Sequence, residues 1–511
     1  MEAKIKKTCI ALAAALSVLH ASAIQKPNII VIYADDVGYG DIGCYGATAI
    51  DTPNIDALAK RGIRFTAGYA TSSTCTPSRY SLLTGDYPFR NERAGQKEVL
   101  PGNAPLIIDT ARPTLPSMLK SVGYSTALVG KWHLGLGSYS EPLDWNGPIQ
   151  PGPAEVGFDY SFHMAATGDR VPSVYIENGR IVGLDPNDPV EVSYQAPIGS
   201  EPTGLSHPQR LRIQSDEQHS GTIVNGVGRI GWMSGGNSAR WDDEMMGDTF
   251  LGKALEFIGN CQDQPFFLFY ATHENHVPRL PHPRFRGSSG LGVRGDVVVQ
   301  LDWCVGKLVE TLKQNGQLDN TLIVFSSDNG PAIFDGYYDG APEKNGDHRA
   351  AGPWRGDKYS AWEGGCRVPF IVSWPGAIEP GRSAAIVSQV DLLASFASLT
   401  GAELPNDFRS DSQNLIDLLT GRSHEGRDHV VLQGVGIKAI RSGDWKYVPP
   451  GTVLSKGGID EKILETIGEA GALYFLPEDP EELNNLAGVY PAKAMELKKL
   501  LEAELDATTV D

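Results

Sequence analysis

The chain has 511 residues, of which 41% are hydrophobic, and its formal net charge at pH 7 is −18. At about 100–200 residues per domain, this length predicts two or three domains and a large core. The negative charge argues against nucleic acid or an anionic membrane as a partner, so local basic residues would have to hold any anionic substrate.

The first 23 residues have the three parts of a signal peptide. Three lysines precede an apolar run over residues 9–19, and the small residues 21–23 offer a cleavage site. The run is shorter than the ~20 apolar residues that span a bilayer. The sequence therefore predicts a cleaved signal peptide over residues 1–23, export to the periplasm or the extracellular space, and no membrane insertion.

From residue 28 to about residue 400, short apolar runs alternate with helical patterns. Apolar runs of this kind are typical of strands buried on both faces. The predicted strands are 28–33, 125–129, 266–270, 321–325 and 368–372. The predicted helices are 54–61, 114–122, 248–260 and 297–315. The alternation predicts an α/β fold with a mostly parallel sheet flanked by helices.

Two regions depart from this alternation. Residues 139–245 are polar, rich in Gly and Pro and weakly periodic, which is typical of long loops that shape a pocket at a sheet edge. After Thr400 the pattern changes to short strands and a closing helix, expected at 430–433, 437–441, 445–447, 473–475 and 493–505. We therefore expect a catalytic domain over residues 24–405 and a smaller α+β subdomain, with a short antiparallel sheet, over residues 406–511.

Cys75 begins the most specific local motif, Cys75-Thr76-Pro77-Ser78-Arg79. Pro77 favours a helix start just after Cys75, where free backbone N–H groups and the helix dipole suit an anion. Arg79 adds a positive charge one turn later. For this motif alone, an ordinary loop cysteine is an alternative. A thiolate catalyst is another, although it would need a histidine base and export suits it poorly.

Acidic and amide side chains follow two of the predicted strands. Asp35 and Asp36 come after strand 28–33, and Asp328 and Asn329 come after strand 321–325. Ligands gather at the carboxyl ends of parallel strands, so we expect these groups to meet. Adjacent carboxylates repel each other unless a cation joins them, and all-oxygen ligands suit calcium or magnesium rather than zinc. Turn formation is the alternative for either pair alone.

Basic side chains follow the same strand ends. Lys131 and His133 flank Trp132 and so point to one side. His276 follows strand 266–270, with His273 nearby, and Lys358 precedes strand 368–372. Any one of these residues could lie on a solvated face. Together they predict an anion-binding pocket beside the metal.

With these motifs the chain resembles the type I, formylglycine-dependent sulfatase family. The resemblance runs from Lys26 to residue 486 and is carried by P-N-I-I-V-I-Y-A-D-D at 27–36, C-T-P-S-R at 75–79, G-K-W-H-L-G at 130–135, S-D-N-G at 327–330 and E-G-G-C-R-V-P at 363–369. It implies the alkaline phosphatase-like fold and hydrolysis of sulfate esters.

The resemblance also implies the metal and the nucleophile. Asp35, Asp36, Asp328 and Asn329 would hold one calcium ion, which would also contact the modified Cys75. A separate maturase would oxidise Cys75 to formylglycine, which is then hydrated to a geminal diol. One hydroxyl would attack sulfur, and the second would allow sulfate to leave as the aldehyde reforms. An ordinary serine lacks that second hydroxyl.

The remaining implied roles belong to basic residues. Arg79 and Lys131 would hold the diol and the sulfate, and Lys358 would bind sulfate. His133 would help to remove a proton from the second hydroxyl. The family pattern places a histidine shortly before a proline, which selects His276 over His273 as the group at the leaving oxygen; His273 would then support the site or the fold.

The natural substrate is expected to be a sulfated carbohydrate, such as a glycosaminoglycan, mucin or algal glycan fragment, attacked from its end. We expect His273, His348 and Arg349 to contribute to substrate binding. One alternative is a hydrolase of phosphate diesters or phosphonates that also uses formylglycine, because both substrates are singly charged and tetrahedral. A calcium-dependent carbohydrate-binding protein without catalysis is another, but it predicts the loss of a catalytic side chain, and all are present.

Overall fold

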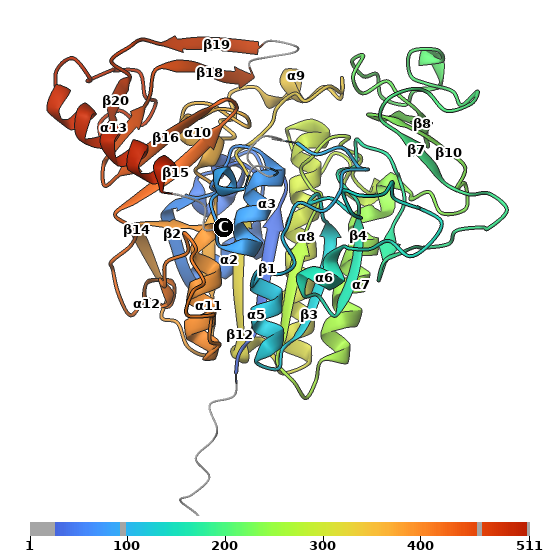
Figure 1. Ribbon diagram of the computed structural model, residues 1–511, viewed down its shortest axis with the longest axis horizontal. Helices are drawn as coiled ribbons and strands as arrows, with labels where there is room; N and C mark the ends of the chain where they lie inside the picture. Colours follow the sequence, from blue (N-terminus) through green and yellow to red (C-terminus); the bar gives the residue numbers. More distant parts are fainter. Residues whose placement is uncertain (1–25, 92, 94–98, 457–461, 508–511) are drawn as a thin grey trace, which may run out of the picture.

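The computed structural model describes residues 26–91, 93, 99–456 and 462–507, so the predicted signal peptide lies outside the described residues. A ten-stranded sheet crosses the molecule in the order β14-β2-β13-β12-β1-β11-β3-β4-β5-β6 (Figure 1). Its strands are β1 Asn28–Ala34, β2 Gly62–Tyr69, β3 Ser125–Lys131, β4 Tyr160–Met164, β5 Ile176–Glu177, β6 Arg180–Ile181, β11 Phe266–Ala271, β12 Thr321–Ser327, β13 Phe370–Ser373 and β14 Gly381–Ser388.

The centre of this sheet is parallel, as predicted. β12, β1, β11, β3 and β4 pair in parallel, whereas β13 runs antiparallel to both β12 and β2. Because β13 runs the other way, its amino end lies at the edge where the neighbouring strands have their carboxyl ends. The residues that precede β13, including Lys358, can therefore reach that edge.

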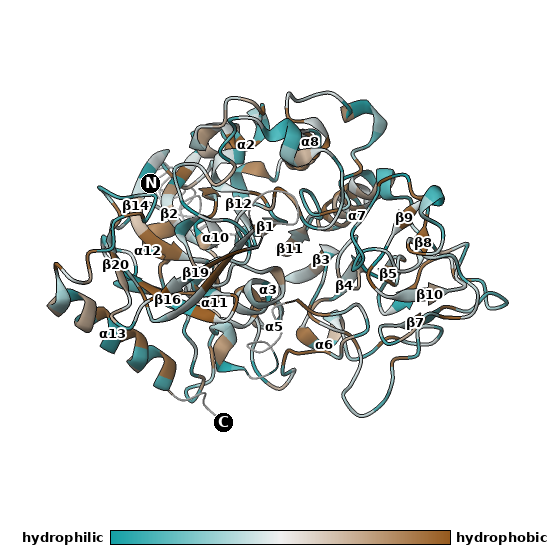
Figure 2. Ribbon diagram, turned by 90° about the horizontal axis from the view of Figure 1, so that it is seen from above, coloured by the Kyte–Doolittle hydropathy of each residue, from teal (hydrophilic) through white to brown (hydrophobic). Residues whose placement is uncertain are grey.

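Two cores fill the two faces of the sheet. Alternate side chains of β1 point to opposite faces, so Ile29 and Val31 lie in one cluster, and Ile30 and Ile32 lie in the other. Figure 2 shows the helices on the two sides of the row of strands. One side carries α3 Cys75–Thr84, α5 Leu115–Ser121 and α11 Leu392–Thr400, and the other carries α2 Pro53–Lys60, α7 Met246–Asn260 and α8 Gly292–Gln314.

The polar region 139–245 contains more regular structure than the sequence predicted. It supplies β4, β5 and β6 to the main sheet, and it also forms two small antiparallel pairs. Those pairs are β7 Glu191–Ser193 with β10 Trp232–Ser234, and β8 Ile223–Val224 with β9 Val227–Gly228. β4 escaped prediction because serine and histidine interrupt its apolar residues, although four of its five residues are buried.

The C-terminal part forms a separate four-stranded antiparallel sheet with a closing helix, as predicted. Its elements are β15 His429–Gly434, β16 Ile437–Ser442, β17 Trp445–Val448, β20 Ala472–Phe475 and α13 Pro491–Asp506, with a hairpin of β18 Gly451–Lys456 and β19 Lys462–Ile467. Buried Lys446 lies 3.3 Å from Glu363 in the main body and 2.8 Å from Glu482. The domain boundary near residue 405 stays a prediction.

In the described part of the chain, no helix is both long and apolar enough to cross a membrane. The five described cysteines are all unpaired.

Candidate active site

Strand register brings the predicted acidic pairs to one edge of the sheet. Ala34 of β1 is level with Ser327 of β12, so the two residues after each strand end lie side by side. Ala271 of β11 is level with Gly130 of β3, which places Lys131 beside them. In Figure 1 this edge lies at the top of the strands, between the C-terminal sheet and the loops of residues 165–245.

Asp35 and Asp328 each bind a buried cation. Lys131 Nζ donates to both oxygens of Asp35, at 2.8 and 2.7 Å. Arg79 donates to Asp328 Oδ2 from Nε at 3.0 Å and from Nη2 at 2.7 Å. All four side chains are fully buried. Burial raises the pKa of Asp35 well above its usual value, and the carboxylates of Asp328 and Asp36 act in the same direction against Lys131.

Asp36 has its own set of partners. Its Oδ2 accepts a hydrogen bond from Lys358 Nζ at 2.9 Å, and its Oδ1 accepts one from Asn329 Nδ2 at 2.7 Å. Burial opposes ionisation of this carboxyl, but Lys358 and His276 outweigh burial and lower its pKa to about 2. Asp36 also has a φ of 57°, an unfavourable left-handed conformation of the kind that clusters at functional sites.

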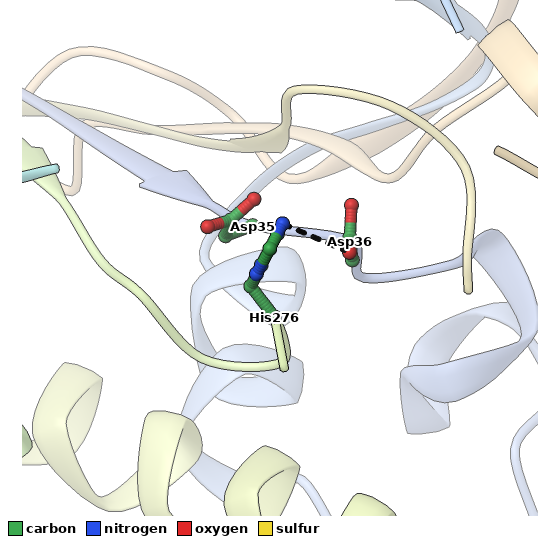
Figure 3. Close-up of side chains that lie close together, drawn as sticks. All are labelled: Asp35, Asp36 and His276. Carbon is green, nitrogen blue, oxygen red and sulfur yellow. Dashed lines mark ion pairs between the residues drawn. The ribbon is translucent and has the colours of Figure 1, made fainter. Parts of the chain in front are cut away.

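The oxygen atoms at this edge fit a hard cation. Asn329 Oδ1 is buried and has no hydrogen-bond partner in the described structure, so a strong acceptor is left without a donor. Figure 3 shows Asp35, Asp36 and His276 converging, and one donor atom of each lies within 4.8 Å of the others. With Asp328 added, the donors are mainly carboxylate and amide oxygens, which calcium prefers.

Cys75 is the first residue of α3, rather than the residue just before the helix as the sequence predicted. Its Sγ lies 3.3 Å from His133 Nδ1, and His133 Nε2 lies 2.9 Å from the Leu100 carbonyl oxygen. Burial raises the pKa of the Cys75 thiol. A raised pKa is the opposite of what a thiolate nucleophile needs, so the arrangement argues against that alternative.

His276 and His273 have different neighbours. His276 Nδ1 lies 2.7 Å from the Val277 carbonyl oxygen, and its Nε2 lies 3.9 Å from Asp36 Oδ2. Burial, with Lys358, lowers the pKa of His276 to about 3. His273 instead packs edge-on against Phe250 of α7, at 5.8 Å between ring centroids. The structure therefore brings His276, and not His273, to the acidic pairs.

The substrate-binding role of His348 and Arg349 stays a prediction, and the structure shows both side chains bonded to other partners. His348 Nε2 is 2.8 Å from Asp41 Oδ1, in a buried group that also contains Arg294. Arg349 is exposed and forms an ion pair with Glu481 at 2.7 Å. Within the described residues, neither side chain bonds to the groups around Cys75.

The site is also bordered by charged side chains that the sequence patterns did not reveal. Arg170 Nη1 donates to both oxygens of Asp169, at 2.9 and 2.8 Å. Arg170 is near enough to act on the pKa of His133, which burial, Lys131 and Arg170 lower well below its usual value. These residues follow β4, so recognising that strand would have indicated them. Asp335 also accepts a hydrogen bond from Lys358, at 3.1 Å.

Known proteins are similar to this chain in sequence and fold. The family described as Sulfatase matches residues 27–402. The N-acetylgalactosamine-6-O-sulfatase of Bacteroides thetaiotaomicron is 49% identical over 487 residues, covering 94% of this chain and 93% of the relative. Human arylsulfatase A is 32% identical over 528 residues, covering 98% of this chain and 91% of the relative.

A solved structure from work on the metabolism of multiple glycosaminoglycans by Bacteroides thetaiotaomicron superimposes with a TM-score of 0.89. It is 48% identical to this chain and covers 94% of this chain and 99% of its own length. The resemblance drawn from the five motifs and the expected alkaline phosphatase-like fold are thereby confirmed.

Proposed function

Since this chain belongs to the sulfatase family and is a sulfuric ester hydrolase, we propose that it acts through formylglycine derived from Cys75 and a bound calcium ion. The observation that carries the proposal is the position of residue 75. It begins a buried helix and lies 3.3 Å from His133, while three cations converge on the neighbouring carboxylates.

The donor set described above would hold calcium through Asp35, Asp36, Asp328 and Asn329. When bound, these groups would supply a nucleophilic hydroxyl, a second hydroxyl and a Lewis acid for sulfate ester hydrolysis. Cys75 Sγ marks the position from which an oxygen of the modified residue would reach His133.

Three cations offset negative charge at the edge of the sheet. Arg79, Lys131 and Lys358 are buried and carry fixed hydrogen bonds to carboxylates. A sulfate group entering beside them would meet positive charge in a setting with little water, where electrostatic attraction is strong. These residues would orient the sulfate and stabilise the charge that develops on its oxygens.

The two histidines would handle protons on opposite sides of sulfur. Burial, with Lys131 and Arg170, lowers the pKa of His133 and so favours its neutral form; Nε2 donates to the Leu100 carbonyl, which leaves Nδ1 able to accept a proton from residue 75. His276 donates from Nδ1 to the Val277 carbonyl, so its Nε2 faces the site. The approach of a sulfate anion favours the imidazolium, which can then give a proton to the leaving oxygen.

We infer that the substrate is a sulfated carbohydrate and, more narrowly, 6-sulfated N-acetylgalactosamine at the end of a glycan. The support is the 49% identity to a relative of that name over 93% of its length. Asp169 and Arg170 would contact the sugar ring, because their paired charges offer both an acceptor and donors beside residue 75.

The predicted signal peptide would direct export, and a separate maturase would modify Cys75. We also propose that the chain is divided into a catalytic domain over residues 24–405 and a C-terminal subdomain over residues 406–511.

Mass spectrometry of the tryptic peptide 65–79 tests the nucleophile. Conversion of the –SH-bearing side chain to an aldehyde lowers the mass of the peptide by a fixed amount. We expect the fraction of converted peptide to rise in proportion to specific activity across preparations. Full activity with unmodified Cys75 would refute the mechanism. Turnover of an aryl phosphate diester measured beside the aryl sulfate separates the alternative hydrolase, and a preference for phosphate would reject the sulfatase assignment.

A further inference from the structure

A buried histidine that contacts Asp169, the ion-pair partner of Arg170, has no part in the proposed chemistry. His219 lies in the segment between β7 and β8, and its side chain is 6% exposed. Its Nδ1 is 2.7 Å from Asp216 Oδ1, and its Nε2 is 3.4 Å from Asp169 Oδ2. Nδ1 makes a hydrogen bond to Asp216 and Nε2 makes an ion-pair contact with Asp169, so a carboxylate at each ring nitrogen favours the imidazolium.

Close packing fixes the ring of His219. The ring of Tyr337 lies 4.9 Å away, and the backbone N–H of Asp216 donates to the Gly336 carbonyl at 2.8 Å. Gly336 has a φ of 87°, and a Cβ there would lie 2.0 Å from His219 Nδ1. Only glycine therefore permits this approach.

The charges around His219 favour its protonated form. Burial lowers its pKa, but the hydrogen bonds and charges of Asp169 and Asp216 outweigh burial and raise the pKa to about 9. Asp335 lies close enough to act on Asp216. Burial keeps the pKa of Tyr337 well above its usual value, so this neighbour stays neutral.

The group continues from His219 to the active site. Asp169 accepts hydrogen bonds from the Thr167 hydroxyl and from Arg170 Nη1. Arg170 Nε and Nη2 make no hydrogen bond within the described part of the chain, and the side chain is 11% exposed. Arg170 also acts on the pKa of His133, and Cys75 acts on the pKa of Arg170, so the guanidinium is close enough to both to interact with them.

We propose that His219 is a positioning residue for sugar recognition. As an imidazolium it holds the Asp169 carboxylate and, through it, the Arg170 guanidinium, in the orientation that binds hydroxyl or amide groups of the sulfated sugar. The inference rests on the proposed function. His219 itself touches neither the sulfate nor residue 75, so its loss should weaken binding of the sugar more than it slows the chemical step.

The variant His219→Gln tests this role with two substrates, 6-sulfated N-acetylgalactosamine and 4-nitrophenyl sulfate. We expect KM for the sugar to rise about ten- to a hundredfold, the range for losing a hydrogen bond to a charged group, with a much smaller change in kcat. The effect on kcat/KM should be at least about tenfold larger for the sugar than for the aryl sulfate, which lacks ring hydroxyls. His207→Gln on the same segment is the matched control, because among the described side chains His207 bonds to Ser206 alone, and it should behave as wild type.

The pH dependence gives a readout that a merely structural role would not move. Since the pKa of His219 is raised from 6.5 to about 9, the folded enzyme keeps the imidazolium at neutral pH and loses it as pH rises through about 9. KM for the sugar should therefore rise in that upper range. Asp216→Asn removes one carboxylate and should move this rise to lower pH.

An unchanged sugar KM in His219→Gln, or an unmoved pH profile in Asp216→Asn, would overturn the proposal. Equal losses on both substrates in a folded His219→Gln protein would also overturn it, because they would place His219 in the chemistry. Asp216→Asn keeps the test valid if the first variant folds poorly. Failure of the wild-type protein, with residue 75 modified, to hydrolyse either sulfate would instead refute the proposed function.

Discussion

His133 is fixed between Cys75 and the carbonyl of Leu100. Its Nδ1 lies 3.3 Å from Cys75 Sγ, and its Nε2 lies 2.9 Å from the carbonyl oxygen. Since Nε2 donates that hydrogen bond, the lone pair on Nδ1 faces residue 75. This geometry suits removal of a proton from residue 75 after the alcohol has left, rather than protonation of the alcohol itself.

His133→Ala should therefore slow the second half of the reaction. We expect rapid release of about one equivalent of alcohol per active site, followed by turnover about 10²–10⁴-fold slower than wild type. Rapid-mixing measurements of alcohol release would detect the burst. His163→Ala controls for loss of a buried imidazole, because His163 lies near Trp132 rather than residue 75. Slow turnover without a burst would contradict the assignment.

His276 should matter according to the leaving group. His276→Ala removes the proton donor, so hydrolysis of a sugar sulfate, whose alkoxide leaves poorly, should fall about 10²–10⁴-fold. Hydrolysis of 4-nitrophenyl sulfate should fall much less, because its phenolate leaves without a proton. Steady-state kcat/KM for the two substrates measures the difference. His273→Ala is the neighbouring control, and equal losses on both substrates in His276→Ala would reject the role.

Removal of calcium should abolish activity and lower thermal stability. A ligand that binds only the folded state at a hundred times its Kd stabilises that state by about 2.7 kcal/mol. We expect a chelator to inactivate the enzyme, and calcium to restore both activity and Tm. Asn329→Ala should need more calcium for the same rise in Tm. Asn28→Ala at the opposite end of β1 removes another buried amide and should keep the wild-type calcium response. Full activity in the metal-free protein would exclude the ligand assignment.

Much of this site could be predicted because parallel strands end at one edge. Asp35, Asp36, Asp328 and Asn329 each follow a continuous apolar strand, so their meeting follows from register. Arg170 and His219 could not be found in this way. They lie in polar segments with weak periodicity, and β4, which would have indicated the place of Arg170, contains a serine and a histidine.

The direction of a side chain on a loop is harder to predict than its place in the sequence. His348 and Arg349 are adjacent and precede Lys358, which made both of them candidates for substrate binding. In the structure His348 is bonded to buried Asp41, whereas Arg349 reaches the C-terminal part of the chain at Glu481. Both side chains form pairs with charged residues that are distant in the sequence, and no local sequence pattern predicts such pairs.

These two neighbours should respond differently to substitution. His348→Ala should lower the free energy of unfolding by about 1–3 kcal/mol, because it removes a buried partner of Asp41. The charges of Arg294 and His348 outweigh burial and lower the pKa of Asp41 to about 2, so this stabilisation should be present above the usual value of 3.8 and be lost as pH falls through 2. Arg349→Ala should cost less than about 0.5 kcal/mol, since its ion pair is exposed.

Denaturant unfolding measures these stabilities, and sugar kinetics test the original prediction separately. A rise in KM for the sulfated sugar in either variant, at unchanged stability, would support a role of that residue in substrate binding.

The burial of residue 75 has a consequence for the order of events in the cell. Cys75 is only 1% exposed, and every residue of α3 is buried around it. If a second enzyme modifies Cys75 as proposed, it could not surround a side chain in that position, so oxidation would have to occur while this segment is still unfolded. We expect purified maturase to convert a synthetic peptide of residues 65–79 but to leave the folded, unmodified protein unchanged. Conversion of the folded protein at a similar rate would show that this region opens. Otherwise, under the proposed mechanism, a chain that folds before modification would stay inactive, and the time available before folding would limit the yield of active enzyme.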